Sequence, residues 1–142
     1  MRSTAAARTL YFENVAGRVW EEPEQYLRLE YRSGPREEVQ FRALLTHLSQ
    51  ALLRRQWQRI LVDQRAMVPF SAGEQAWMTT HWLPQAVLEN GYRYGAVVLA
   101  QNVFARLAMT RLIMATRDLP HTYRNFEHDG EALTWLLAQP DA

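Results

Sequence analysis

Short apolar runs of strand length alternate along this chain with longer stretches of helical periodicity, and this alternation limits the fold more than any other feature. Residues 59–63 (RILVD) and 94–100 (YGAVVLA) are apolar at their centres, as expected for strands buried on both faces. Segments of helical periodicity lie around them at 35–56, 71–90 and 102–117. The pattern predicts an α/β fold with a mostly parallel sheet and right-handed crossovers.

The N-terminal third predicts an antiparallel start to this sheet. Residues 9–15 place aromatic side chains in a short extended run, and an Ala-Gly turn at 16–17 separates them from a second run at 18–20, as in a hairpin. Residues 26–32 (YLRLEYR) then alternate apolar and charged side chains, the pattern of a strand with one buried face. The predicted sheet is therefore mixed, with an antiparallel N-terminal part.

The C-terminal segments complete a single predicted domain. Residues 121–126 (HTYRNF) indicate a last, more polar strand nearer an edge, and Asp129 is expected to cap a short terminal helix. No repeat, linker or low-complexity tract divides the chain. We therefore expect one domain over residues 9–139, with four helices packed on the sheet and a flexible N-terminus at 1–8.

Composition favours a folded chain and excludes several kinds of site. Of the 142 residues, 48% are hydrophobic and 22% are charged, close to the average for globular proteins. Without cysteine, the chain has no disulfide framework, thiolate nucleophile or cysteine-based zinc site. All sixteen basic residues are arginine, spread along the chain against fifteen acids, which argues against nucleic-acid binding. No run suggests a signal peptide or a membrane span, and a cytoplasmic protein is expected.

Motif searches give no catalytic signature. The sequence has no GxSxG, GxxxxGK, GxGxxG or HExxH element, so the common serine-hydrolase, nucleotide-binding and zinc-protease machinery is not indicated. The four histidines lack the i,i+4 spacing that brings two imidazoles to one metal. We expect a protein that is not an enzyme and needs no metal or cofactor. Catalysis by Asp63 with Arg65 or Arg124 is the weakest alternative, because no nucleophile or second acid is placed beside them.

Polar and charged residues are predicted at the carboxyl ends of the parallel strands, where open α/β sheets bind their ligands. They are Asp63, Gln64, Arg65, Gln101, Asn102, Arg124 and Asn125. Together with the neighbouring helix N-termini they can hold a small anionic ligand or a protein partner. The alternative is that Asp63 and Arg65 pair with neighbours and Asn102 only caps its helix.

A second candidate site is apolar. Trp77 and Trp82 lie on one predicted helix, which Pro84 should kink or break. With Phe104 they can line a groove for an apolar ligand. Core packing is the alternative explanation, with Trp82, beside Pro84, expected to be the more exposed of the two tryptophans.

The same helix begins with Ser71-Ala72-Gly73-Glu74, the pattern of a capping box. The order of elements, the strand-end Asp63 and this turn into a serine-capped helix resemble the SpoIIAA-like fold, which STAS domains share with CRAL-TRIO lipid-binding domains. The resemblance spans residues 9–139 and is closest to small bacterial STAS-like proteins. In STAS anti-sigma factor antagonists a partner kinase phosphorylates the matching serine, so the resemblance implies Ser71 as a phosphorylation candidate. Here Phe70 replaces the usual preceding acid and Ala72 the second hydroxyl, and helix capping alone also explains Ser71.

The resemblance implies a non-enzymatic regulatory or binding module that acts on a protein partner or a small ligand and is switched at Ser71. The alternative is a carrier of an apolar, lipid-like ligand of the CRAL-TRIO kind, with a cavity between sheet and helices near Trp77, Trp82 and Phe104. A homodimer through the aromatic edge at Tyr11 and Phe12 is also considered.

Overall fold

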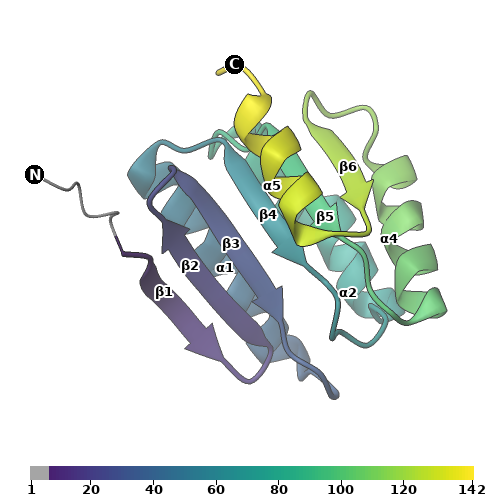
Figure 1. Cartoon of the computed structure of the whole chain (residues 1–142). Coiled ribbons are helices and arrows are strands. Elements are labelled where there is room, and N and C mark those ends of the chain that lie inside the picture. The colour runs from purple at the N-terminus through teal and green to yellow at the C-terminus, as the bar shows by residue number, and fades with distance from the viewer. Residues whose placement is uncertain (1–6) are drawn as a thin grey trace, which may run out of the picture.

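The computed structural model describes residues 7–142 and shows six strands side by side in one sheet (Figure 1). Their order across the sheet is their order in the chain: β1 (Thr9–Asn14), β2 (Gly17–Glu22), β3 (Tyr26–Tyr31), β4 (Arg59–Asp63), β5 (Tyr94–Val98) and β6 (Thr122–Phe126). β1, β2 and β3 pair antiparallel, whereas β3 to β6 pair parallel. The predicted mixed sheet with an antiparallel N-terminal part is confirmed.

Four helical segments pack on the sheet, as predicted, and they divide unequally between its two faces. They are α1 (Glu38–Arg55), the continuous run of α2 (Ala72–Trp77), η1 (Met78–Trp82) and α3 (Leu83–Leu88), then α4 (Val103–Ala115) and α5 (Asp129–Ala138). Each connection from β3 to β6 moves one strand in the same direction, and right-handed crossovers of this kind place their helices on one face. α5 follows β6 and returns across the opposite face (Figure 1).

The alternation of side chains along each strand produces two cores of different size. On the face covered by α1, η1 and α4, Leu29, Val62 and Val97 belong to the larger core. On the opposite face α5 completes a smaller core: Tyr26, Leu61, Ala96, Val98, Ala132 and Leu136. α5 packs on β4, β5 and β6, so the half of this face formed by β1, β2 and β3 lies beside α5 rather than beneath it.

Pro84 lies inside the α2–α3 segment without breaking it. A proline has no N–H to donate to the preceding turn, and the residues before it widen into the π-helical turn η1, after which the Leu83 N–H donates to the Met78 carbonyl. The expected kink or break is replaced by this turn. Trp82, expected to be exposed, is only 6% exposed, and its indole N–H donates to the Leu45 carbonyl oxygen at 2.6 Å.

Three ends of elements differ from the sequence-based expectation. α5 begins at Asp129, so His128 and not Asp129 holds the N-cap position. α1 begins at Glu38, three residues later than predicted, after Gly34 with φ of 89° and an extended Glu37. Residues 1–6 of the N-terminus expected to be flexible lie outside the described residues, whereas Arg8 donates to Glu22 at 2.8 Å and stacks 3.9 Å from the Trp20 ring centroid. Of the described helices, none is both long and apolar enough to cross a membrane.

Candidate ligand-binding cavity

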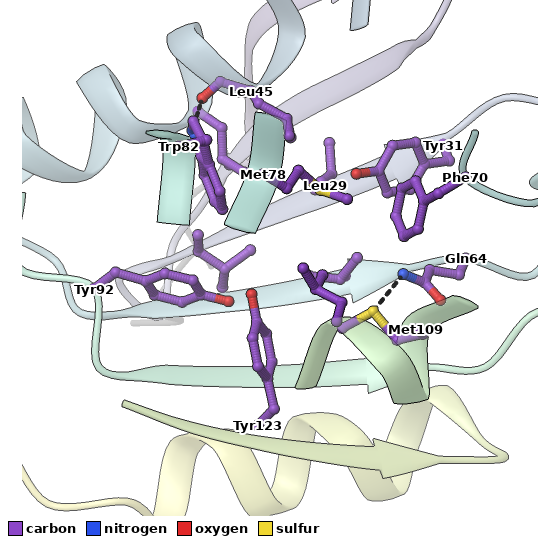
Figure 2. A pocket seen from close by; sticks show the side chains of 14 residues that line it. Leu29, Tyr31, Leu45, Gln64, Phe70, Met78, Trp82, Tyr92, Met109 and Tyr123 are labelled. Carbon is purple, nitrogen blue, oxygen red and sulfur yellow. Dashed lines mark hydrogen bonds between the residues drawn. The ribbon is translucent and has the colours of Figure 1, made fainter. Parts of the chain in front are cut away.

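A small cavity lies inside the larger core, between the sheet and the helices α1, η1 and α4 (Figure 2). Its volume is about 20 Å³, which is room for one water molecule. Fourteen side chains line it, and none of these carries a charge. Besides the bonded Trp82 indole, the polar groups that they offer are the hydroxyls of Tyr31, Tyr92 and Tyr123 and the amide of Gln64.

Tyr92 contributes the most isolated of these polar groups. Its side chain is fully buried. The Tyr123 hydroxyl is its neighbour, but within residues 7–142 the Tyr92 hydroxyl makes no hydrogen bond of normal geometry. Figure 2 shows this hydroxyl pointing into the cavity, with the Tyr123 hydroxyl beside it and Tyr31 on the far side. An unpartnered buried polar group costs about 1–3 kcal/mol, so this position stabilises the fold less than a phenylalanine of the same shape would.

Gln64 places an amide at the other end of the cavity. It is 1% exposed and donates from Nε2 to the Met109 sulfur at 3.2 Å, a weak acceptor. Its Oε1 has no partner in the described part of the chain. Gln64 continues the side-chain register of Ile60 and Val62, so a polar residue stands where the strand pattern calls for an apolar one.

Gly95 makes the placement of the two tyrosines possible. A Cβ atom at this position would lie 2.4 Å from the Tyr92 hydroxyl oxygen and 2.4 Å from Cε1 of Tyr123. The rings of Tyr92 and Tyr123 meet edge to face there, with their centroids 5.9 Å apart. Because residue 95 is a glycine, strand β5 has no side chain at the point where Tyr92 and Tyr123 approach the cavity.

The tyrosines around the cavity are uncharged at neutral pH. Burial raises the pKa of Tyr31 and of Tyr92 well above the usual value, and it raises the pKa of Tyr123 to about 12. Removing a phenolate from water costs more than removing a phenol, which explains the direction. All three therefore act as neutral hydrogen-bonding groups.

A buried arginine holds the loop that closes this end of the cavity. The side chain of Arg36 is 2% exposed and donates to the backbone oxygens of Val68 and Pro69 at 3.1 Å each. Its guanidinium lies 5.7 Å from the ring centroids of Tyr31 and Phe70, both of which line the cavity. Arg36 therefore fixes residues 64–71 against the core.

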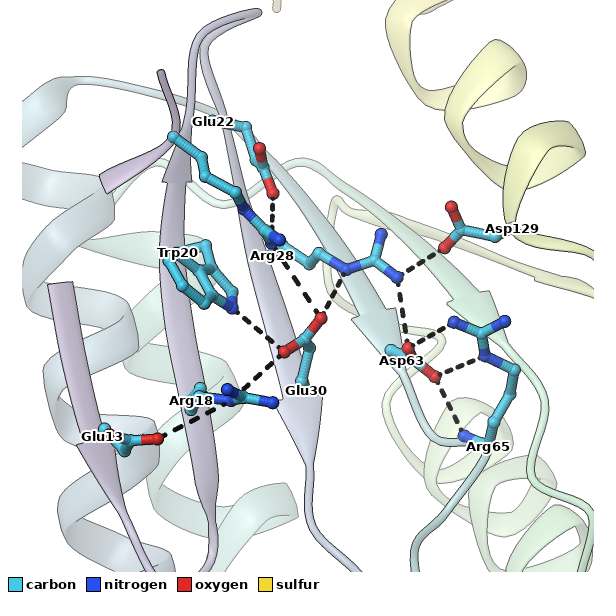
Figure 3. A network of polar contacts seen from close by, with 10 residues as sticks. Glu13, Arg18, Trp20, Glu22, Arg28, Glu30, Asp63, Arg65 and Asp129 are labelled. Carbon is cyan, nitrogen blue, oxygen red and sulfur yellow. Dashed lines mark hydrogen bonds and ion pairs between the residues drawn. The ribbon is translucent and has the colours of Figure 1, made fainter. Parts of the chain in front are cut away.

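The predicted strand-end charges are paired with one another (Figure 3). Arg65 donates from Nε and Nη2 to the two carboxylate oxygens of Asp63 at 3.0 and 2.8 Å, and Arg28 donates to Asp63 at 3.2 Å. Partial burial would raise the pKa of Asp63, but the hydrogen bonds and charges of these arginines hold it below its usual value. The geometry is that of the pairing alternative rather than of an open anion site.

Arg28 extends this pairing over the half of the sheet face that lies beside α5. It is 9% exposed and also donates to Asp129 at 2.6 Å and to Glu30 at 3.1 Å. Glu30 in turn accepts from the Trp20 indole at 3.0 Å (Figure 3). Each charge in this network meets an opposite charge within the protein.

The remaining candidate residues at the strand ends do not form one site. Asn102 caps α4, because its Oδ1 accepts from the backbone N–H groups of Phe104 and Ala105. Gln101 is exposed beside Arg65, to whose carbonyl its N–H donates at 3.4 Å. Arg124 stands on β6, where it lines an open groove beside α5. The structure thus gathers Asp63, Arg65 and Gln101 but not Arg124.

Ser71 forms the capping box that the sequence predicts. Its Oγ accepts from the Glu74 N–H at 3.0 Å, and its own N–H donates to Glu74 Oε1 at 2.8 Å. Glu74 is also bound by Arg36 through two hydrogen bonds of 2.9 and 3.0 Å. Ser71 itself is exposed, and it lies next to Phe70 of the cavity wall.

The three residues of the proposed apolar groove are not brought together. Only Trp82 lines the cavity. Trp77 is half-buried on the outer side, edge to face with Phe41 and beneath Arg42. Phe104 is 68% exposed on α4.

The aromatic edge considered for a homodimer turns inward. Tyr11 and Phe12 are half-buried and pack against α1, where the Phe12 ring stacks on His47 with centroids 3.9 Å apart. This placement explains both aromatic residues by packing within one chain, and the homodimer stays a prediction.

Sequence reasoning placed Gln64 at a strand end and expected a cavity between sheet and helices near Trp82, but it did not connect Gln64 with that cavity. Tyr31, Tyr92 and Tyr123 were not expected as site residues. The available signals were the polar Gln64 in the buried register of β4 and the glycine inside β5, since a glycine in a strand often marks a close approach.

Comparison with protein-family models, with curated proteins and with solved structures gives no match. Within residues 7–142, no three His, Asp or Glu side chains are grouped so that they could hold a metal ion. What the fold and the cavity define is an α/β protein with an uncharged, hydrogen-bonding interior site.

Proposed function

We propose that this protein is a non-enzymatic module that binds a small molecule in the cavity between its sheet and the helices α1, η1 and α4. One observation carries the proposal: the fully buried Tyr92 hydroxyl points into the cavity, and within the described chain it makes no hydrogen bond of normal geometry, even to the neighbouring Tyr123 hydroxyl. A buried polar group without a partner is rare in folded proteins. A bound molecule would supply the missing hydrogen bond.

The chemistry of the lining supports binding rather than catalysis. The side chains offer apolar surface and neutral hydrogen-bonding groups, the mixture typical of small-molecule sites. The pKa values of the three tyrosines lie above the usual value, so these residues are poor bases at neutral pH.

The size of the cavity favours a compact guest over a lipid-like one. A volume of about 20 Å³ accepts one water without rearrangement. A guest of a few non-hydrogen atoms requires Met78 and Met109 of the lining to move, and methionine side chains adapt at low cost. The CRAL-TRIO-like carrier is therefore the less favoured alternative.

We retain a regulatory role of the STAS-like kind as part of the proposal, with Ser71 as its phosphorylation candidate. Ser71 is exposed, and Glu74 links it to Arg36. A phosphate on Ser71 would compete with the capping box for Glu74 and repel that carboxylate. The hold of Arg36 on the loop at residues 64–71 would then weaken, which gives a route from the modification to the cavity.

Xenon tests the proposed function, because it enters cavities without needing hydrogen bonds. Methyl NMR spectra of the whole protein under xenon pressure should show saturable shifts at Met78 and Met109. Val62→Ile adds one methylene at the cavity wall and should abolish them. Val103→Ile, which adds the same group at a 67% exposed position of α4, is the matched control. Shifts that fail to saturate in the wild type, or that persist in Val62→Ile, contradict the proposal.

A further inference from the structure

We infer that the cavity selects an uncharged molecule with a hydroxyl or amide group, and that the Tyr92 hydroxyl is the group that recognises it. This inference rests on the proposed function and names the class of ligand. Such a group both donates and accepts hydrogen bonds, as the hydroxyl of Tyr92 also does. The guest thus supplies a well-formed hydrogen bond to the Tyr92 hydroxyl, which makes none of normal geometry within the described residues.

The absence of charge among the lining side chains sets the first requirement. All fourteen are neutral. The guanidinium of Arg36 lies next to Tyr31 and Phe70 of the wall, but Glu74 and backbone carbonyls already bind it. A charged guest would lose its hydration without gaining an opposite charge. The cavity therefore discriminates against carboxylates, ammonium groups and phosphates.

The polar groups set the second requirement. A purely apolar guest would leave the Tyr92 hydroxyl unpaired and buried, whereas a hydroxyl or amide would pair with it. Tyr31 and Tyr123 present further hydroxyls within the same walls (Figure 2). Gln64 adds an amide oxygen that is also without a partner in the described residues.

Two local features are built around this arrangement. Gly95 leaves open the space in which the Tyr92 hydroxyl lies, only 2.4 Å from where a Cβ would stand. The π-helical turn η1 brings Met78 and Trp82 into the cavity wall. Such turns are rare in proteins, and those that occur are often found at functional sites.

Water has the same hydrogen-bonding chemistry and is small enough for the cavity. A selective site and a hydrated cavity differ in their response to added solutes. A selective site takes up small neutral solutes in a saturable manner. A cavity that holds only water takes up none of them.

Acetamide and acetate provide a matched pair of probes, equal in shape and different in charge. In the methyl NMR assay on the whole wild-type protein, acetamide should produce saturable shifts at Met78 and Met109, and acetate should bind at least about tenfold more weakly. Tyr92→Phe should weaken acetamide binding about threefold to tenfold, the effect of one hydrogen bond, and should leave xenon binding intact. Tyr94→Phe, on the opposite face of β5 against Trp135, should change neither.

The outcomes separate the two proposals. If xenon does not bind to the wild type, the cavity is not a binding site and the proposed function fails. If xenon binds but acetamide does not, the cavity holds water only and the inference is overturned. Equal binding of acetate and acetamide, or unchanged acetamide binding in Tyr92→Phe, also overturns it, because xenon binding reports on the fold of the variant independently.

Discussion

Replacing Gly95 with alanine tests the packing around the cavity most directly. The new Cβ would stand 2.4 Å from the Tyr92 hydroxyl oxygen and 2.4 and 2.5 Å from two ring carbons of Tyr123. Ordinary contacts between such atoms begin near 3.5 Å, so both rings must move by about 1 Å. Tyr92 cannot move freely, because its ring also packs against Trp82 with centroids 6.1 Å apart.

The expected magnitude follows from two opposing effects. Overpacking a well-filled core costs about 1–3 kcal/mol. Because φ of Gly95 lies outside the left-handed region, alanine fits the backbone and should recover about 0.4–1 kcal/mol by restricting the unfolded chain. We expect Gly95→Ala to lower the free energy of unfolding by about 1–2 kcal/mol, a fall in Tm of about 2–8 °C at this chain length.

Urea denaturation followed by tryptophan fluorescence measures this loss. Gly130→Ala is the matched control, because a Cβ at Gly130 of α5 meets nothing within 4 Å, and this variant should be neutral or slightly stabilised. In Gly95→Ala/Tyr92→Phe one of the colliding atoms is removed, so part of the stability should return. A Gly95→Ala protein as stable as the wild type would refute the close packing of the two tyrosines.

Three further predictions concern the charged and polar contacts. Ser71→Ala removes the capping-box acceptor and should lower the free energy of unfolding by about 1 kcal/mol; no change in urea midpoint would contradict a stabilising cap. Arg36→Leu leaves the Glu74 carboxylate buried without its ion pair and should lower the free energy of unfolding by about 3–5 kcal/mol. Its control, Arg42→Leu, removes an exposed i,i+4 ion pair on α1 and should cost about 0.5 kcal/mol or less. Similar losses of stability in both variants would show that burial of the ion pair is irrelevant. The pKa of Asp63 is lowered in the folded state, so its contribution to the free energy of unfolding is complete above the unfolded pKa of about 4 and is lost as the pH falls through the lower folded pKa. In urea titrations below pH 4 the wild type should therefore lose more stability than Asp63→Asn. Parallel curves of stability against pH for the two proteins would argue against the pairing.

The fold was predictable because its signals are local. The apolar centre of 59–63 and the alternation at 26–32 each mark a strand within a few residues, and both strands are present. The single buried face expected for 26–32 is wrong, because Tyr26 and Arg28 on the second face are buried as well. The Ser71 capping box is likewise defined by four consecutive residues. Patterns that span so few residues can be recognised without knowing which other segments pack against them.

A cavity between sheet and helices was expected near Trp82, but most of its lining was not predictable because its walls come from distant parts of the chain. Tyr92 lies between α3 and β5, and its burial depends on Trp82, Tyr123 and the space at Gly95. The exposure of Phe104 and the burial of Trp82 depend in the same way on which side of a helix meets the sheet. The pairing of Asp63 with Arg65 spans only two residues, and for that reason the sequence suggested it as an alternative.

The consecutive order of the six strands also bears on how the chain folds. Each strand pairs with the one made just before it, so no strand has to wait for, or insert between, partners synthesised later. Folding can therefore follow synthesis from the ribosome. The antiparallel pairs among β1, β2 and β3 are local, whereas the parallel pairs join distant residues such as Ile60 and Gly95 and should form more slowly. α5 is the last helix in the chain to be synthesised, and it packs over β4, β5 and β6, where it covers Leu61, Ala96 and Val98.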